Sequence, residues 1–181
     1  MWKNRFAIGV DPGKSGGIVV VQDGQIIDKV IMPVIGKEYD TQAITAFLLK
    51  YKEGGVVYME NLHAIFGVPA RSNFELGRCV GIFQGIAMAL KMPLIEYPPK
   101  EWQKFSWAGI PVVKNPTGKK KKDGTPRYKT DTKKTSLLAA KKIFPAIDFT
   151  PTERAQKPHD GLIDAGLIAW YGYNRIGAHG D

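Results

Sequence analysis

The sequence predicts an α/β fold built on a five-stranded mixed sheet, with three antiparallel strands followed by parallel strands and flanked by helices. Three apolar runs with β-branched residues predict the antiparallel strands, at 6–10, 16–21 and 25–32. Asp23-Gly24 lies between the second and third runs and is a strong two-residue hairpin signal. A helical pattern then precedes the apolar run Val56–Met59, and a helix between two strands is typical of a parallel crossover. We therefore expect the fourth strand to lie beside the first.

The remaining elements follow from hydrophobic spacing and from turn residues. Pro93–Tyr97 is expected to be the fifth strand. Apolar residues recur at helical spacing in five further segments, at 41–51, 74–92, 100–107, 133–144 and 160–174. In the second of these helices, Gly77, Gly81 and Gly85 form a smooth strip, which we interpret as a packing surface or a dimer contact.

Length and composition are those of one folded domain covering residues 1–181. A hydrophobic fraction of 44% in 181 residues argues against disorder. The single cysteine, Cys79, excludes an internal disulfide and a Cys-rich zinc site. No secretory signal and no run of about 20 apolar residues is seen, so we expect no membrane partner and a cytoplasmic location, in a bacterial cell or a phage-infected host.

Positive charge is concentrated in one part of the chain. The formal net charge is +9, and the segment 114–142 alone holds eleven Lys or Arg residues against two Asp. The rest of the chain is therefore balanced, which predicts a local element that binds a polyanion. The alternative is a solvated loop that lysines keep soluble. Glycines and prolines in the Lys-rich insertion at about 112–132 predict an irregular, flexible segment.

Acidic side chains follow two strands that are expected to be parallel neighbours. Asp11 ends the first strand in Asp-Pro-Gly, and Glu60 ends the fourth. Parallel strands end at the same edge of a sheet, so the two carboxylates should lie close together. Each residue also has a plainer interpretation, Asp11 as the start of a turn and Glu60 as an exposed strand end.

Two further carboxylates begin the last predicted helix. Asp160 and Asp164 are spaced i, i+4 and share one helix face, where they repel each other unless a cation neutralises them. With Asp11 and Glu60 they form a set of oxygen ligands without His or Cys, suited to Mg²⁺ or Mn²⁺. Two such ions about 3.5 to 4 Å apart can support phosphodiester hydrolysis.

These motifs together resemble the RuvC-type Holliday-junction resolvases, most closely their phage-borne members. The resemblance extends from Phe6 to about Tyr173, and it rests on the Asp-x-Gly strand end and three later stretches, Val-Tyr-Met-Glu-Asn, Glu-Leu-Gly-Arg-Cys-Val-Gly and His-Asp-Gly-Leu-Ile-Asp-Ala-Gly. It implies an RNase H-like fold, a homodimer, and paired nicks at four-way DNA junctions that leave 5′-phosphate and 3′-hydroxyl ends. It also implies two Mg²⁺ or Mn²⁺ ions per active site.

The resemblance assigns catalytic and metal-binding roles to the four acids. Asp11 would bridge both ions, with Glu60 on one side and Asp160 and Asp164 on the other. Family members commonly carry an Asp or His three residues before the last Asp, and here that position is Gly161. Asp160 stands one residue earlier on the same face, and His159 is a candidate helper.

DNA contacts are expected from basic residues and from a loop after Glu60. The predicted contacts are Lys14, His63, Phe66, Arg71, Lys119, Lys120, Lys121, Lys122, Arg127, Lys129, Lys133 and Lys134. The lysines would bind phosphates, and Phe66 is a candidate for distorting bases at the crossover.

Two other functions remain open on the sequence alone, and chain length excludes a third. A nuclease of the same fold could act more broadly on flaps, forks or D-loops. A non-catalytic DNA-binding module would not require four converging acids. The stretch Asp-Pro-Gly-Lys-Ser-Gly-Gly also resembles the phosphate-binding hairpin of actin-like ATPases, but that two-lobed fold usually needs well over about 300 residues.

Overall fold

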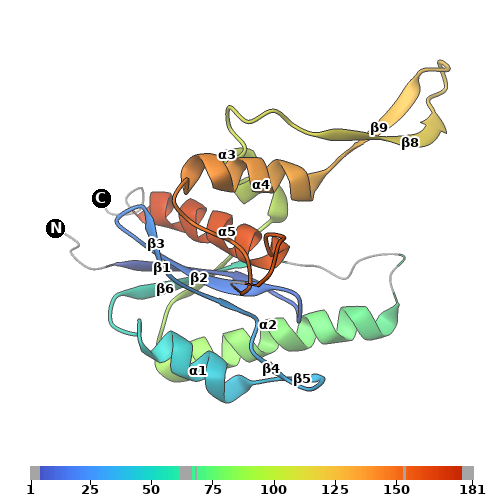
Figure 1. The fold of residues 1–181 in the computed structure, drawn as a ribbon. Helices are drawn as coiled ribbons and strands as arrows, with labels where there is room; N and C mark the ends of the chain where they lie inside the picture. Colours follow the sequence, from blue (N-terminus) through green and yellow to red (C-terminus); the bar gives the residue numbers. More distant parts are fainter. Residues whose placement is uncertain (1–4, 62–66, 68, 153, 177–181) are drawn as a thin grey trace.

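A five-stranded sheet with the order β3-β2-β1-β6-β7 forms the centre of the molecule (Figure 1). The structure is a computed structural model that describes residues 5–61, 67, 69–152 and 154–176. The strands of this sheet are β1 (Phe6–Asp11), β2 (Gly17–Gln22), β3 (Gln25–Ile31), β6 (Gly55–Glu60) and β7 (Leu94–Tyr97). A small separate hairpin, β4 (Val34–Ile35) with β5 (Glu38–Tyr39), follows β3 and was not predicted.

Strand pairing confirms the predicted mixed sheet. β1 is antiparallel to β2 and parallel to β6, with Val10 opposite Met59. β6 in turn pairs in parallel with β7. β1 is thus the central strand. Its apolar side chains are buried on both faces of the sheet, as expected for a strand with helices on either side.

Helices cover both faces of the sheet and enclose two apolar cores. On one face lie α1 (Thr41–Leu49) and α2 (Ala70–Leu90), and on the other lie α3 (Pro99–Ser106), α4 (Thr132–Ile143) and α5 (Asp160–Ile176) (Figure 1). Phe83 and Ile44 belong to the first core, whereas Trp102 and Tyr171 belong to the second.

Glycines allow α5 to lie directly on β1 and β2. A Cβ atom at Gly9 would stand 2.0 Å from the carbonyl oxygen of Ala165, so any side chain there would push the helix away. A Cβ at Gly161 would likewise stand 2.5 Å from the Cα of Gly16. These two contacts set both the distance and the register of α5 on the sheet.

Helix α2 begins earlier than the sequence predicts. It starts at Ala70 and not at Phe74, because Pro69 precedes the first turn, where its missing N–H and fixed φ are compatible with a helix. Gly77, Gly81 and Gly85 are exposed, and a Cβ atom at any of them would have no neighbour within 4 Å. The strip therefore does not pack against any described part of the same chain.

The Lys-rich insertion forms a β-hairpin, so the expectation of an irregular segment is wrong. β8 (Lys114–Lys120) pairs antiparallel with β9 (Pro126–Thr130), and the hairpin projects away from the body of the molecule beyond α4 (Figure 1). Gly118 and Gly124 adopt positive φ, which provides the register shift in β8 and the turn. The glycines that suggest irregular structure in the sequence thus lie in a hairpin of two paired strands.

Among the described helices, none is long and apolar enough to cross a membrane.

Candidate active site

The two strand-end acids lie at one edge of the sheet. Asp11 is the last residue of β1 and Glu60 the last of β6, and the parallel register brings these ends together. Pro12 and Gly13 turn the chain immediately after Asp11, with a φ of +132° at Gly13. Asp11 is therefore fixed at the end of the most central strand.

Helix α5 brings the other two acids to the same edge. Its first turn crosses the β1–β2 connection, where Gly161 packs on Gly16 and leaves no room for a side chain. Asp160 and Asp164 flank this contact on the helix. The position three residues before Asp164 is thus sterically closed, and Asp160 is the carboxylate that the first turn of α5 carries.

Burial and mutual repulsion raise the pKa values of three of these acids. Burial is the largest cause for Asp11, whose pKa lies well above its usual value, and the charges of Asp164, Glu60 and Asp160 raise it further. Burial also raises the pKa of Glu60 to about 7 and that of Asp164 to about 6. The charges of neighbouring acids therefore act on Asp11, Glu60 and Asp164, and these three buried carboxyl groups carry negative charge only in an unfavourable environment.

Two buried side chains that the sequence did not single out support the cluster. The indole Nε1 of Trp102 donates to Oε1 of Glu60 at 3.1 Å, and a hydrogen bond from Ser136 lowers the pKa of Asp164 against the effect of burial. Both residues are 2% exposed. Their types and spacing resemble ordinary core positions, so only the tertiary structure identifies them.

Asp160 occupies the rim of the cluster. Its side chain is 48% exposed, and Oδ2 pairs with Nζ of Lys133 at 2.6 Å. Lys133 also lowers the pKa values of Asp11 and Asp164. This lysine, predicted only as a DNA contact, therefore faces the acids themselves.

The acids fit a hard cation, although they are not arranged as a finished cage. Within the described ranges, no three Asp, Glu, His or Cys side chains stand close enough together to hold a metal ion. However, Oδ1 of Asp164 is buried without a hydrogen-bond partner, and three carboxyl groups have raised pKa values. A divalent cation stabilises such a group of side chains, because it offsets the repulsion between the carboxylates and coordinates a buried oxygen that has no hydrogen-bond partner.

His159 has a structural contact that accounts for its position. Its Nδ1 accepts the N–H of Leu162 at 3.3 Å in the first turn of α5. A neutral imidazole whose Nδ1 accepts this bond carries its proton on Nε2, which can donate to a substrate.

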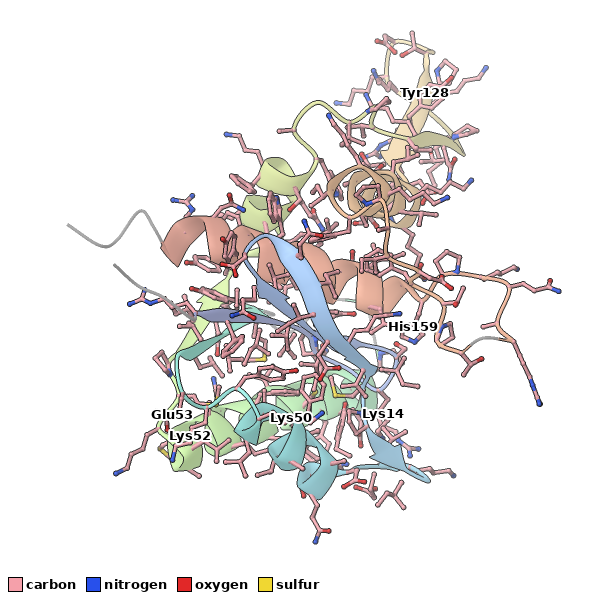
Figure 2. The ribbon with its side chains drawn as sticks, turned by 60° about the vertical axis from the view of Figure 1, so that its left-hand side comes forward. Lys14, Lys50, Lys52, Glu53, Tyr128 and His159 are labelled. Carbon is pink, nitrogen blue, oxygen red and sulfur yellow. The ribbon has the colours of Figure 1, made fainter. Side chains whose placement is uncertain are left out.

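The predicted DNA contacts fall into separate groups. Lys14 and Arg71 line a hollow of about 490 Å³ beside the turn after Asp11. Within it, Lys14 pairs with Glu75 at 2.8 Å. Figure 2 shows Lys14 and His159 well away from Tyr128 on the projecting hairpin. The hairpin carries the next group, which consists of Lys119, Lys120, Lys121, Lys122, Arg127 and Lys129.

Of the four remaining predicted contacts, the structure describes two. Lys133 lies at the acid cluster, and Lys134 pairs with Asp131 at 3.6 Å. His63 and Phe66 lie outside the described residues, so their predicted roles stay predictions.

Comparison with known proteins finds similarity in structure only. No protein-family model matches the sequence, and no curated protein matches it. Among solved structures, T. thermophilus RuvC in complex with a Holliday junction substrate matches with a TM-score of 0.61 and 19% identity, over 96% of each chain. A second Thermus thermophilus RuvC structure matches with a TM-score of 0.55 and 20% identity, over 94% of this chain and 95% of that one.

The chain has the RuvC fold. The similarity spans nearly the whole of both chains, which confirms the predicted RNase H-like α/β architecture. At about one identical residue in five, it establishes the fold, whereas activity must be argued from the site itself.

The raised pKa values predict that metal-free protein loses stability as pH rises. The folded pKa values of about 6 for Asp164 and about 7 for Glu60 exceed those of the unfolded chain, near 4. Their contribution is complete below about pH 4 and is lost as pH rises through the folded values. Urea unfolding in chelator should therefore give a lower free energy of unfolding at pH 7.5 than at pH 5.

Asp164→Asn should flatten this dependence and stabilise the metal-free protein at pH 7.5, by on the order of 1–3 kcal/mol. Asp148→Asn is the control, because hydrogen bonds from Thr150 lower the pKa of Asp148 and place its titration below this pH range. If the free energy of unfolding of Asp164→Asn depends on pH as steeply as that of wild type, the pKa of the Asp164 carboxyl group is not raised by its surroundings.

Proposed function

We propose that this protein is a metal-dependent endonuclease that resolves four-way DNA junctions by paired nicks. The observation that carries the proposal is the convergence of four acids at the end of the central strand of a RuvC fold. The RuvC of T. thermophilus has been solved with a Holliday junction substrate, which supports branched DNA as the substrate class. An excess of positive charge in the segment 114–142 is consistent with such a polyanion.

In this proposal Asp11, Glu60, Asp160 and Asp164 would hold two Mg²⁺ or Mn²⁺ ions. Bound ions would lower the pKa of water and stabilise charge on the phosphate and the leaving 3′-oxygen. Asp11, on the central strand, is suited to the shared position. Trp102 keeps Glu60 oriented through its 3.1 Å hydrogen bond.

Lys133 has a further role in binding the substrate. It faces the acids from the exposed rim, with its side chain 72% accessible. A cation at this place can attract a phosphate toward the negative cluster, and the Asp160 carboxylate keeps it aimed there. Lys14 and Arg71 would contact the strand on the other side of the Asp11 turn.

Paired nicks require two active sites, and we propose a homodimer formed through α2. Its outer face combines the three exposed glycines with Phe74 and Met88, which are 68% and 77% exposed. Apolar side chains beside a smooth backbone strip provide a surface that a second copy can approach closely.

The broader alternative, cleavage of flaps, forks or D-loops, uses the same chemistry and differs only in substrate. A purely DNA-binding module does not explain the repelling acids. A cytoplasmic location, in a bacterial cell or a phage-infected host, stays a proposal that accompanies the function.

Asp11→Asn should abolish nicking and leave junction binding intact, because it removes the shared ligand but not the basic surface. The measurement is cleavage of a synthetic four-way junction in Mn²⁺, with duplex, flap and RNA–DNA hybrid for comparison. Asp23→Asn, in the exposed β2–β3 turn, is the matched control and should cleave normally. Full activity in Asp11→Asn would rule out the metal role.

Replacing Lys119 to Lys122 with Gln should weaken junction binding and reduce its salt dependence. Each lost phosphate contact lowers the slope of log K against log salt by roughly 0.7 to 0.9. Gln at Lys50, Lys52, Lys91 and Lys100 provides a control with equal loss of charge outside the hairpin. Equal slopes for the two variants would mean that the hairpin makes no special contribution.

Gly81→Glu should convert the dimer into monomers and prevent paired nicking, because it places charge in the centre of the exposed α2 face. Light scattering after size exclusion measures the mass directly. Leu49→Glu, at a 53% exposed apolar position on α1, is the control. A dimer that persists in Gly81→Glu would place the contact elsewhere.

A further inference from the structure

The β8–β9 hairpin contains a hollow of about 300 Å³, lined by Thr117, Lys119, Arg127, Tyr128 and Lys129. Tyr128, labelled on the projecting hairpin in Figure 2, is 56% exposed. It lies opposite Pro116 in the strand pairing. A large aromatic ring at the surface of a projecting ribbon packs in no core. Packing in a hydrophobic core therefore does not explain why a tyrosine stands at this position.

The walls of this hollow are basic because Lys119, Arg127 and Lys129 line it, whereas Asp123 in the turn of the hairpin does not. Oδ1 of Asp123 accepts the N–H of Thr125 at 3.0 Å and its hydroxyl at 2.6 Å, which closes the turn. The hydroxyl of Thr117 donates to the carbonyl of Arg127 at 2.9 Å and joins the two strands beside the hollow. The ring and the three cations thus stand on a defined scaffold.

The base of the hairpin is attached to the element that reaches the acids. The N–H of Asp131 donates to the carbonyl of Val113 at 2.8 Å, and Asn115 donates to the Asp131 carboxylate at 2.9 Å. The same carboxylate caps α4 by accepting the N–H of Lys134. Lys133 lies in this first turn, so the hairpin and the acid cluster share one support.

We propose that the hollow binds one unpaired nucleotide of a DNA strand, with its base stacked on Tyr128 and its phosphates held by Lys119, Arg127 and Lys129. The inference rests on the proposed function only in taking DNA as the ligand. A hollow of this size suits a small ligand, and an aromatic ring among cations is the combination that binds single strands.

The ring distinguishes unpaired nucleotides from duplex. In duplex DNA the base faces are covered by their neighbours, so a surface tyrosine has nothing to stack on. Branched DNA offers bases at the branch that can leave the stack. The seven residues of β8 span roughly 20 Å, so the hairpin would hold such a strand at some distance from the acids.

The test uses full-length protein in chelator and a single-stranded oligonucleotide with one 2-aminopurine. Stacking on Tyr128 should change the fluorescence of the base, and Tyr128→Ala should weaken binding roughly tenfold and abolish that change. Tyr128→Phe keeps the ring and should behave as wild type. Phe105→Ala removes an exposed aromatic outside the hairpin and serves as the control.

Equal affinity of Tyr128→Ala and wild type would overturn the proposal. So would an equal loss of affinity for duplex and for single strand, because it would indicate a general contact with the backbone. Oligonucleotide binding that depends on Tyr128 in a protein that fails to nick junctions would support the hollow and contradict the proposed function instead.

Discussion

The closeness of α5 to the central strands is the constraint on which the rest of the structure depends. At Gly9 and Gly161 the helix and sheet backbones meet with no space for a side chain. This contact buries the apolar face of α5, places Asp164 beside the end of β1, and leaves Asp160 at the rim. A helix held farther out by even one methyl group would separate the four acids.

The cluster formed in this way is electrostatically costly without a cation. Burial and like charges raise the pKa values of Asp11, Glu60 and Asp164 together, and one oxygen of Asp164 has no hydrogen-bond partner. Lys133 offsets part of this cost from the solvent side. Such strain is typical of a site that is completed by its ligand, and it explains why the fold maintains charges that weaken it.

Helix α4 would link the proposed DNA recognition to the proposed chemistry. Its inner side carries Ser136, whose hydrogen bond lowers the pKa of Asp164, and its first turn carries Lys133. Its cap, Asp131, ties down the base of the hairpin. A strand bound by the hairpin and a phosphate at the acids would therefore be positioned by the same short helix.

The sequence by itself determined the order and pairing of the main strands, because apolar runs, Asp23-Gly24 and the helical crossover are local signals. It also predicted that the four acids lie near one another, since a strand end and an i, i+4 pair can be read without coordinates. The predicted start of α2 and the predicted irregular insertion were wrong, because proline and glycine occur in loops and also at the ends and turns of helices and strands. Only the tertiary structure decided that Gly161 is closed, that Trp102 and Ser136 support the acids, and that Tyr128 is left exposed. Each of these points depends on which residues from distant parts of the chain come together, and no local pattern records that.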